Sequence, residues 1–306
     1  MSNLIVGVSP HIRSKNSTQR IMLDVIIALC PALIASVVIY GFRSLLLTVI
    51  SAAACVACEF LWEKALKWDI TILDGSAVVT GILIAFNVPV QMPIWQLIAG
   101  DIFAIIVVKM LFGGIGCNFM NPALGGRILM MFSFTSSITG YTYPANGIDA
   151  LSSATPLAAQ SSLGWNNFMT LFLGNHGGVL GETCVLALLI GAAYLLIRRV
   201  IKPWIPLCYL GSLLLFSWIF GAENPVLSLL MGGAVLGAFF MATDYVTSPV
   251  TNKGKVIFGI GCGLITAAIR VFGNYAEGVT FSIIIMNLLV PYIDDLTLTK
   301  PMGGAK

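Results

Sequence analysis

The sequence predicts an all-α integral membrane protein of about ten transmembrane helices, on three observations. Apolar residues make up 58% of the 306 residues and charged residues only 9%, whereas a soluble domain carries about 25% charged residues. Apolar runs of about 15 to 20 residues, each near the length that spans a bilayer, recur along nearly the whole chain. Basic residues gather in alternate connections. We expect one lipid-embedded domain over residues 1–306 and no nucleic-acid partner.

Ten segments are candidate spans because each is apolar and bounded by polar or turn-forming residues. In chain order they are 21–40, 44–60, 76–88, 94–112, 123–134, 183–197, 204–220, 225–241, 256–272 and 279–293.

The basic residues predict the orientation of these spans. An N-terminus on the inner side places every one of the 16 basic residues except Arg43 and Arg270 on or near the inner side. No Lys or Arg occurs between Ile128 and Ile197. We therefore expect a cytoplasmic arm over 1–20, an outward-facing loop over 135–180 and both termini inside, in the cell (inner) membrane.

Two of the candidate spans are too short for a bilayer. Segments 76–88 and 123–134 would form helices of about 18–20 Å at 1.5 Å per residue, against a hydrocarbon core of about 30 Å. We expect half-helices or re-entrant segments there, buried by neighbouring helices because a broken backbone needs hydrogen-bond partners.

A weak internal repeat accompanies the short spans. Residues 75–87 align without gaps to residues 232–244, with 4 of 13 positions identical. The two copies run in opposite directions in the expected topology. This pattern predicts two inverted five-helix repeats, with a site at their interface.

The expected outward loop contains a small polar cluster, Asp149-Ala-Leu-Ser-Ser-Ala-Thr155. Ser153 and Ala154 leave room for a bulky group, and Ser152 and Ser153 can donate hydrogen bonds to a phosphate. The following proline pushes Thr155 towards an extended backbone. A polar turn with a helix N-cap is the alternative interpretation.

A second cluster, between Gly113 and Arg127, combines five glycines with Asn118 and Asn121. Glycines allow a backbone to approach a ligand closely, and each Asn offers one acceptor and one donor group. This mixture suits the uracil-like edge of an isoalloxazine ring. The alternative is a helix break that Asn caps, with glycines for close helix packing.

Charged residues within apolar spans are costly and mark ion pathways or ion pairs. Asp101 and Asp244 are the candidates for an ion pathway. Asp24, Glu59 and Lys109 lie near predicted helix ends, which places them at the membrane interface.

Asp244 also has a structural alternative. Lys253 and Lys255 follow within eleven residues, so a plain ion pair would account for the carboxylate. Cys55 and Cys58 have the spacing of a redox or metal pair, but they lie inside an apolar span, which favours buried structural thiols.

Three sequences carry a resemblance to the NqrB/RnfD family of membrane subunits. They are Ser9-Pro-His-Ile-Arg13, the glycine- and asparagine-containing run Gly113–Arg127, and Asp149-x-x-Ser-Ser-Ala-Thr155. The resemblance covers essentially the whole chain. The family often has Gly at the position of Ser153, and the chain lacks the long N-terminal extension typical of NqrB, which favours the Rnf member.

The resemblance implies a cofactor at each of the two clusters. Thr155 would carry FMN through a phosphoester, attached by a flavin transferase. A non-covalent riboflavin would lie by Asn118 and Asn121. The Rnf complex moves electrons between ferredoxin and NAD and couples this to Na⁺ or H⁺ transport. The chain would relay electrons among the other subunits of that complex.

Two other classes of protein fit the composition. An inverted-repeat solute channel or transporter would have the same architecture without a redox cofactor. A structural membrane scaffold would leave Thr155 unmodified. Covalently bound flavin distinguishes both from the redox subunit.

Overall fold

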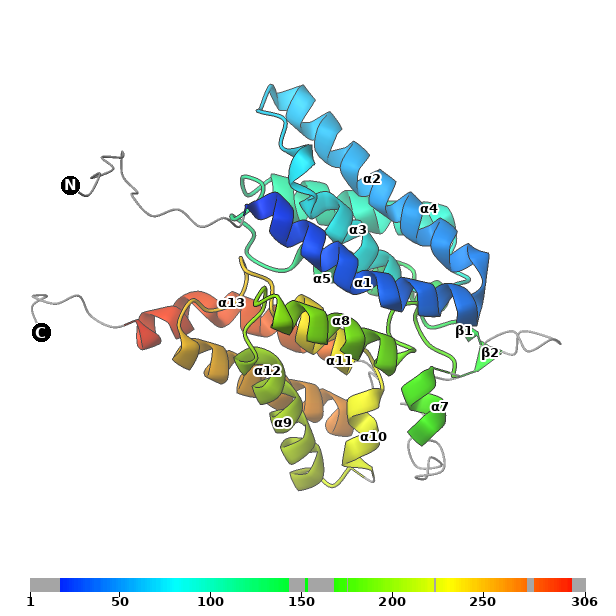
Figure 1. Ribbon diagram of the computed structural model, residues 1–306, viewed down its shortest axis with the longest axis vertical. Helices are drawn as coiled ribbons and strands as arrows, with labels where there is room; N and C mark the ends of the chain where they lie inside the picture. The colour runs from blue at the N-terminus through cyan, green and yellow to red at the C-terminus, as the bar shows by residue number, and fades with distance from the viewer. Residues whose placement is uncertain are drawn as a thin grey trace, which may run out of the picture.

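The computed structural model describes residues 17–142, 152–153, 168–174, 176–222, 224–273 and 278–298 (Figure 1). The elements of the first half are α1 (Thr18–Tyr40), α2 (Phe42–Leu66), the 3-10 helix η1 (Ile72–Asp74), α3 (Ser76–Phe86), α4 (Ile94–Ile102), the π-helix η2 (Phe103–Met110), α5 (Pro122–Ser133) and α6 (Thr135–Ile138). A two-stranded antiparallel sheet of β1 (Tyr141–Thr142) and β2 (Ser152–Ser153) follows. The remaining helices are α7 (Phe168–Leu173), α8 (Val185–Ile197), α9 (Trp204–Ile219), α10 (Pro225–Leu230), α11 (Ala234–Leu236), the π-helix η5 (Gly237–Met241), α12 (Asn252–Phe272) and α13 (Val279–Thr297).

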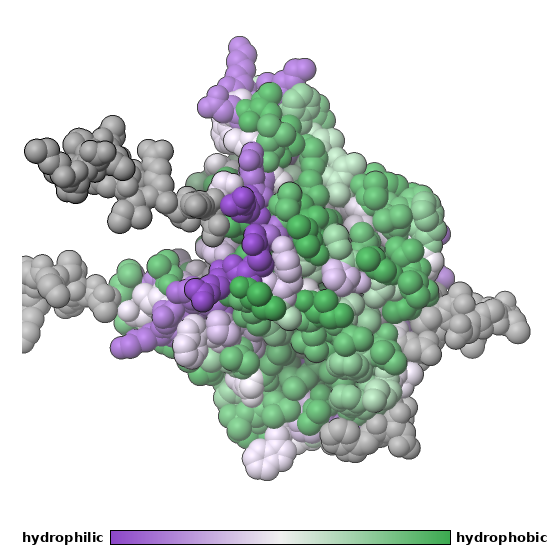
Figure 2. Space-filling view, viewed as in Figure 1, coloured by the Kyte–Doolittle hydropathy of each residue, from purple (hydrophilic) through white to green (hydrophobic). Residues whose placement is uncertain are grey.

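Four helices, α1, α2, α12 and α13, are long and apolar enough to cross a membrane. Their outward faces carry large apolar side chains, as do those of the shorter helices: Val38 on α1 and Ile197 on α8 are each 80% exposed. Figure 2 shows these residues as a broad hydrophobic surface over the body of the molecule. A surface of this kind is stable against lipid, so the chain is an all-helical membrane protein in its described core.

Each predicted span contains a helix, but two spans differ from the prediction in shape. Segment 225–241 is broken between α10 and α11, where Gly232 (φ 63°) and Gly233 (φ 65°) adopt left-handed backbone. Segment 94–112 changes from α-helix to π-helix at Phe103. The short helices were predicted correctly: α3 has 11 residues and α5 has 12.

The start of α1 and the end of α13 lie on one side of the molecule. In Figure 1, α1 begins and α13 ends at the left, while β1 and β2 lie at the right. Hydrophilic residues gather at the left of Figure 2, over the start of α1 and the ends of α2 and α8. This polarity agrees with the orientation that the basic residues predict.

One buried segment has no helical structure. Residues 176–183, between α7 and α8, are all buried. The N–H groups of Leu180 and Gly181 donate to the carbonyls of Val88 (3.1 Å) and Phe86 (2.9 Å), beyond and at the end of α3. A Cβ at position 181 would lie 2.3 Å from Phe86, so glycine is required. This segment therefore supplies the partners that a short membrane helix lacks.

Helix packing divides the described chain into two groups. The helix α2 packs on α3 and α4, and α4 packs on α5. The helix α9 packs on α10 and α12, and α12 packs on α13. Contacts of α1 with α8 and of α5 with α13 join the two groups.

Candidate functional site

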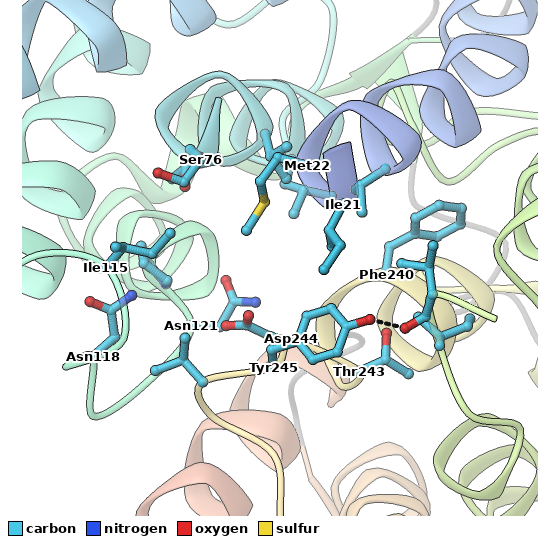
Figure 3. A pocket seen from close by; sticks show the side chains of 18 of the residues that line it. Ile21, Met22, Ser76, Ile115, Asn118, Asn121, Phe240, Thr243, Asp244 and Tyr245 are labelled. Atoms are coloured by element: carbon cyan, nitrogen blue, oxygen red, sulfur yellow. Dashed lines mark hydrogen bonds between the residues drawn. The ribbon is translucent and has the colours of Figure 1, made fainter. Parts of the chain in front are cut away.

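A cavity lies where the two groups of helices meet, near the start of α1 (Figure 3). Its cavity volume is about 90 Å³, and the space around it, with the open solvent at its mouth, is about 780 Å³. One wall comes from α1, α3 and η2, and the other from the end of α8, η5 and the loop after η5. The lining side chains on which the site depends are Met22, Ser76, Lys109, Asn118, Asn121, Asp244 and Tyr245. Most of the remaining lining is aliphatic or aromatic.

Asn118 and Asn121 both line the cavity, but they make different contacts. Asn121 caps α5: its Oδ1 accepts hydrogen bonds from the N–H groups of Ala123 (3.0 Å) and Leu124 (3.4 Å). Its Nδ2 donates to the carbonyl of Met241 (3.3 Å) at the end of η5. The Oδ1 atom of Asn118 is buried and has no hydrogen-bond partner among the residues that the structure describes. Asn118 is therefore the residue whose polar group is available to a ligand.

The glycines of this segment serve two purposes. Gly113, Gly114 and Gly116 have φ angles of 114°, 86° and 92°, which side chains rarely tolerate, and they turn the chain between η2 and α5. Gly125 and Gly126 allow close packing, since a Cβ at Gly126 would lie 2.9 Å from the carbonyl oxygen of Gly100 on α4. The capping and packing interpretation is thus correct for Asn121 and these two glycines.

Asp244 lies at the cavity, half-buried, where Figure 3 shows it beside Asn121. Its Oδ2 accepts a hydrogen bond from the Thr247 hydroxyl (3.2 Å). Within the described part of the chain, neither Lys253 nor Lys255 forms an ion pair with it. The structural ion pair that the sequence suggested is therefore wrong for these residues.

Lys109 and Ser76 form the most polar part of the opposite wall. The Nζ atom of Lys109 lies 2.7 and 2.8 Å from the carboxylate oxygens of Glu59 and 2.7 Å from the Ser76 hydroxyl. Lys109 and Glu59 are only 2% and 1% exposed. The sequence placed both near helix ends, at the membrane interface. The structure buries both side chains within the protein because α2 and η2 pack side by side.

Asp24 is buried as well, in contact with the end of α8. Its carboxylate accepts hydrogen bonds from Tyr194 (2.9 Å) and Arg198 (3.2 Å), which belong to the end of α8. These two contacts of Asp24 hold the start of α1 against the end of α8, at the rim of the cavity.

Two other sequence candidates lie away from the cavity. Arg127 on α5 donates to Oδ1 of Asn87, the residue that ends α3. Asp101 on α4 is fully buried against α2, where Ser51 contacts its Oδ1 at 2.7 Å. Arg127 therefore joins α5 to the end of α3, and Asp101 lies deeper in the contact between α2 and α4.

The acceptor cluster lies only partly in the described chain. Asp149, Ala154 and Thr155 are outside the described residues. Ser152 and Ser153 form β2, which pairs with β1 through Thr142 and Tyr141. The strand lies at the opposite end of the molecule from the start of α1 (Figure 1).

Sequence reasoning missed several interior residues. Ser76, Lys109 and Tyr245 line the cavity, and the buried Glu182 lies in the irregular segment before α8. Ser76 follows Gly75, the start of the internal repeat, and that repeat was the available signal for a site at this position. Glu182 stands one residue before a predicted span, where hydropathy gives no signal.

Comparison with known proteins gives consistent results over the whole chain. The model of the NQR2, RnfD, RnfE family matches residues 5–303. The D subunit of the Na(+)-translocating ferredoxin:NAD(+) oxidoreductase complex of Acetobacterium woodii is 45% identical, covering 99% of this chain and 96% of that protein. The D subunit of the proton-translocating ferredoxin:NAD(+) oxidoreductase complex of Clostridium ljungdahlii is 37% identical over 97% of this chain and 96% of that protein. The D subunit of the ion-translocating oxidoreductase complex of Escherichia coli (strain SMS-3-5 / SECEC) is 32% identical over 98% and 99%.

Proposed function

Because this chain belongs to the NQR2, RnfD, RnfE family, we propose that it is the membrane-embedded D subunit of an ion-translocating ferredoxin:NAD⁺ oxidoreductase complex and relays electrons through two flavins. The protein has no catalytic activity alone and works with the other subunits of the complex in the cell membrane. The names of its relatives include both Na⁺ and proton translocation.

We assign the helices to two inverted five-helix repeats. The repeats pair α1 with α8, α2 with α9, α3 with α10, α11 and η5, α4 and η2 with α12, and α5 with α13. Two facts support this assignment. Neighbours within each group pack in the same order. Both α3 and α11 begin directly after a glycine with left-handed backbone, Gly75 (φ 78°) and Gly233 (φ 65°).

The cavity is the proposed site of a non-covalent flavin, riboflavin in this family. Its walls suit an isoalloxazine ring because they are mainly apolar and carry a few polar groups. The unpartnered Oδ1 of Asn118 is the single observation that carries this assignment. A buried acceptor without a partner is costly, and a ring N–H would satisfy it.

The residues of the cavity would hold this flavin and tune its surroundings. A bound flavin supplies a carrier that accepts electrons and passes them on. Asn118 would orient its polar edge, and Asn121 would position the backbone of α5 beneath it. Met22 and the other apolar side chains exclude water. Lys109 and Asp244 set the charge on opposite walls.

We assign a covalent FMN to Thr155, attached through a phosphoester by a flavin transferase. The support is the family motif and the extended conformation of Ser152–Ser153 just before it. This strand lies at the end of the molecule opposite the start of α1 (Figure 1), and residues near the start of α1 line the cavity. Two flavins so placed would carry electrons across the thickness of the membrane. Asp101 and Asp244 are the carboxylates that we assign to the ion path.

Replacement of Thr155 by alanine tests the covalent flavin. Expressed with the flavin transferase, the wild-type chain should fluoresce on a denaturing gel and yield a flavin-bearing peptide that contains Thr155. Thr155→Ala should show neither, and Thr139→Ala, in the same part of the chain, should keep both. Fluorescence that persists in Thr155→Ala would show that the attachment site lies elsewhere.

Cysteine labelling tests the orientation. In a background without native cysteines, a membrane-impermeant reagent applied from outside should label Asn146→Cys, in the loop before Thr155. It should not label Ser14→Cys in the N-terminal arm. The reverse pattern would overturn the inside–outside assignment of both flavins.

A further inference from the structure

The buried face of α2 is polar along the whole helix. The helix has 25 residues and extends about 37 Å at 1.5 Å per residue. Its buried residues, apart from Leu47, are all polar or ionisable, and they recur three or four positions apart, on one side of a helix. They are Ser44, Thr48, Ser51, Cys55, Glu59 and Glu63. A membrane helix that buries polar residues and exposes apolar ones faces a functional interior.

This polar face contacts α4 and η2 at two places. Ser51 contacts Asp101, and Glu59 contacts Lys109; both pairs are 50 positions apart in sequence. Because both pairs have the same sequence separation, α2 runs parallel to the continuous helix formed by α4 and η2. The second pair reaches the cavity through Lys109 and Ser76. Asp101 thus lies on the same helix contact as the cavity wall, two helical turns deeper.

The contacts of Ser51 indicate the protonation state of Asp101. The Oγ atom of Ser51 lies 2.8 Å from the carbonyl oxygen of Gly81 and 2.7 Å from Oδ1 of Asp101. A serine hydroxyl carries one hydrogen, and a carbonyl can only accept. One hydroxyl hydrogen cannot make two short, linear hydrogen bonds. With a carboxylate at position 101, Ser51 donates to Oδ1 and its contact with the Gly81 carbonyl is left without a hydrogen. With a neutral acid, Ser51 donates to Gly81, Oδ1 donates to Ser51 and both contacts are satisfied, so the geometry favours the neutral acid.

The surroundings agree with a neutral acid. Asp101 is 0% exposed, and among the described residues no N–H or O–H group donates to its Oδ2; the Cys55 thiol on α2 is its other hydrogen-bonding neighbour. An unpaired oxygen of a neutral acid costs far less than one of a buried carboxylate. The ionisable groups nearby are Cys55 and Cys58 on α2 and the Glu59–Lys109 pair, whose cation is already neutralised. The helix α3 contributes no ionisable residue.

We propose that Asp101 is a proton-binding site inside the membrane, occupied in this structure, which exchanges its proton along the polar face of α2. The step is H⁺ binding and release by one carboxyl group; no electron is transferred in it. Glu59, Lys109 and Ser76 link the site to the cavity. The role of Asp101 in ion transport rests on the proposed function, whereas the assignment of a bound proton to Asp101 does not.

Infrared spectroscopy of the purified complex tests the bound proton directly. A protonated carboxyl has a C=O stretch distinct from the amide bands, and this stretch shifts in D₂O. The wild-type complex and Asp69→Asn, which alters an exposed carboxylate, should show the band that Asp101→Asn lacks. Asp101→Asn should also assemble normally, because its amide can donate to Ser51 as the neutral acid does.

Three outcomes decide the proposal. Identical carboxyl bands in wild type and Asp101→Asn would overturn the protonated state, whatever the flavin content. Failure of Asp101→Asn to assemble would show that the negative charge is needed and would also overturn it. In proteoliposomes, Asp101→Asn should keep both flavins and electron flow but lose the associated proton uptake; unchanged uptake would refute the transport role.

Discussion

The two short buried helices, α3 and α11, begin alike but are stabilised by different chemistry. Each starts after a glycine with left-handed backbone, and a cation lies at each start. At α3 the cation is Lys109, which bonds to the Glu59 carboxylate and to Ser76. At α11 it is Arg270, whose guanidinium donates to three main-chain carbonyls and one hydroxyl.

The two cations have different acceptors, and only Lys109 lines the cavity. Arg270 satisfies the carbonyls of Ser228, Met231 and Gly232 that the helix break leaves open. Guanidinium geometry suits such a set of acceptors. Lys109 instead holds an ionisable carboxylate beside the cavity. Similar backbone is therefore accompanied by a buried ion pair at α3 and by the hydrogen bonds of one guanidinium at α11.

The largest loss of stability should follow from the replacement of Lys109 at the start of α3. Lys109→Met leaves the Glu59 carboxylate buried without its cation, which costs about 3 to 5 kcal/mol for a buried pair. We expect a correspondingly lower free energy of unfolding in detergent. The double variant Glu59→Gln with Lys109→Met should recover most of the loss, because no charge then remains unpaired. Equal losses in the single and double variants would show that packing, and not charge, dominates.

A smaller effect is expected at Arg270. Arg270→Lys keeps the charge but cannot reach both Ser228 and Gly232, so at least one buried carbonyl loses its partner. An unsatisfied buried acceptor costs about 1 to 3 kcal/mol. Thermal unfolding of the detergent-solubilised protein measures the loss. The control is Arg43→Lys, because Arg43 is an exposed residue of α2. If Arg270→Lys is as stable as the wild type, the positive charge alone stabilises the helix break between α10 and α11.

The smallest loss of stability is expected for the two asparagines of the cavity, and it should differ between Asn121 and Asn118. Asn121→Ala removes the N-cap of α5, worth about 0.5 to 2 kcal/mol. Asn118→Ala removes no hydrogen bond recorded between described residues and should change stability by less than about 0.5 kcal/mol. Unfolding in urea compares the two variants. Equal destabilisation would contradict the division between a capping and a ligand-binding asparagine.

Much of the fold follows from local sequence. Apolar runs located a helix in each of ten segments, and their lengths identified α3 and α5 as short. Glycine pairs are ambiguous locally: Gly232 and Gly233 break a helix by left-handed backbone, whereas Gly125 and Gly126 lie within α5 and permit close packing. Tertiary context decides between these two uses, so the break before α11 was not predicted.

The candidate site was predictable only where a motif or repeat marked it. Asn118, Asn121 and Asp244 were identified from sequence, and the structure brings all three to one cavity. The Glu59–Lys109 pair depends on the parallel packing of α2 and η2, and no local pattern encodes a partner 50 residues away. The acceptor role of Thr155 stays a prediction.

The central claim is that the cavity binds a flavin through Asn118, independently of the flavin at Thr155. The decisive measurement is the amount of extractable and of covalent flavin in purified Asn118→Leu, with wild type and Thr155→Ala alongside. Asn118→Leu should lose extractable flavin and keep covalent flavin, and Thr155→Ala should show the converse. Wild-type levels of extractable flavin in Asn118→Leu would contradict the account.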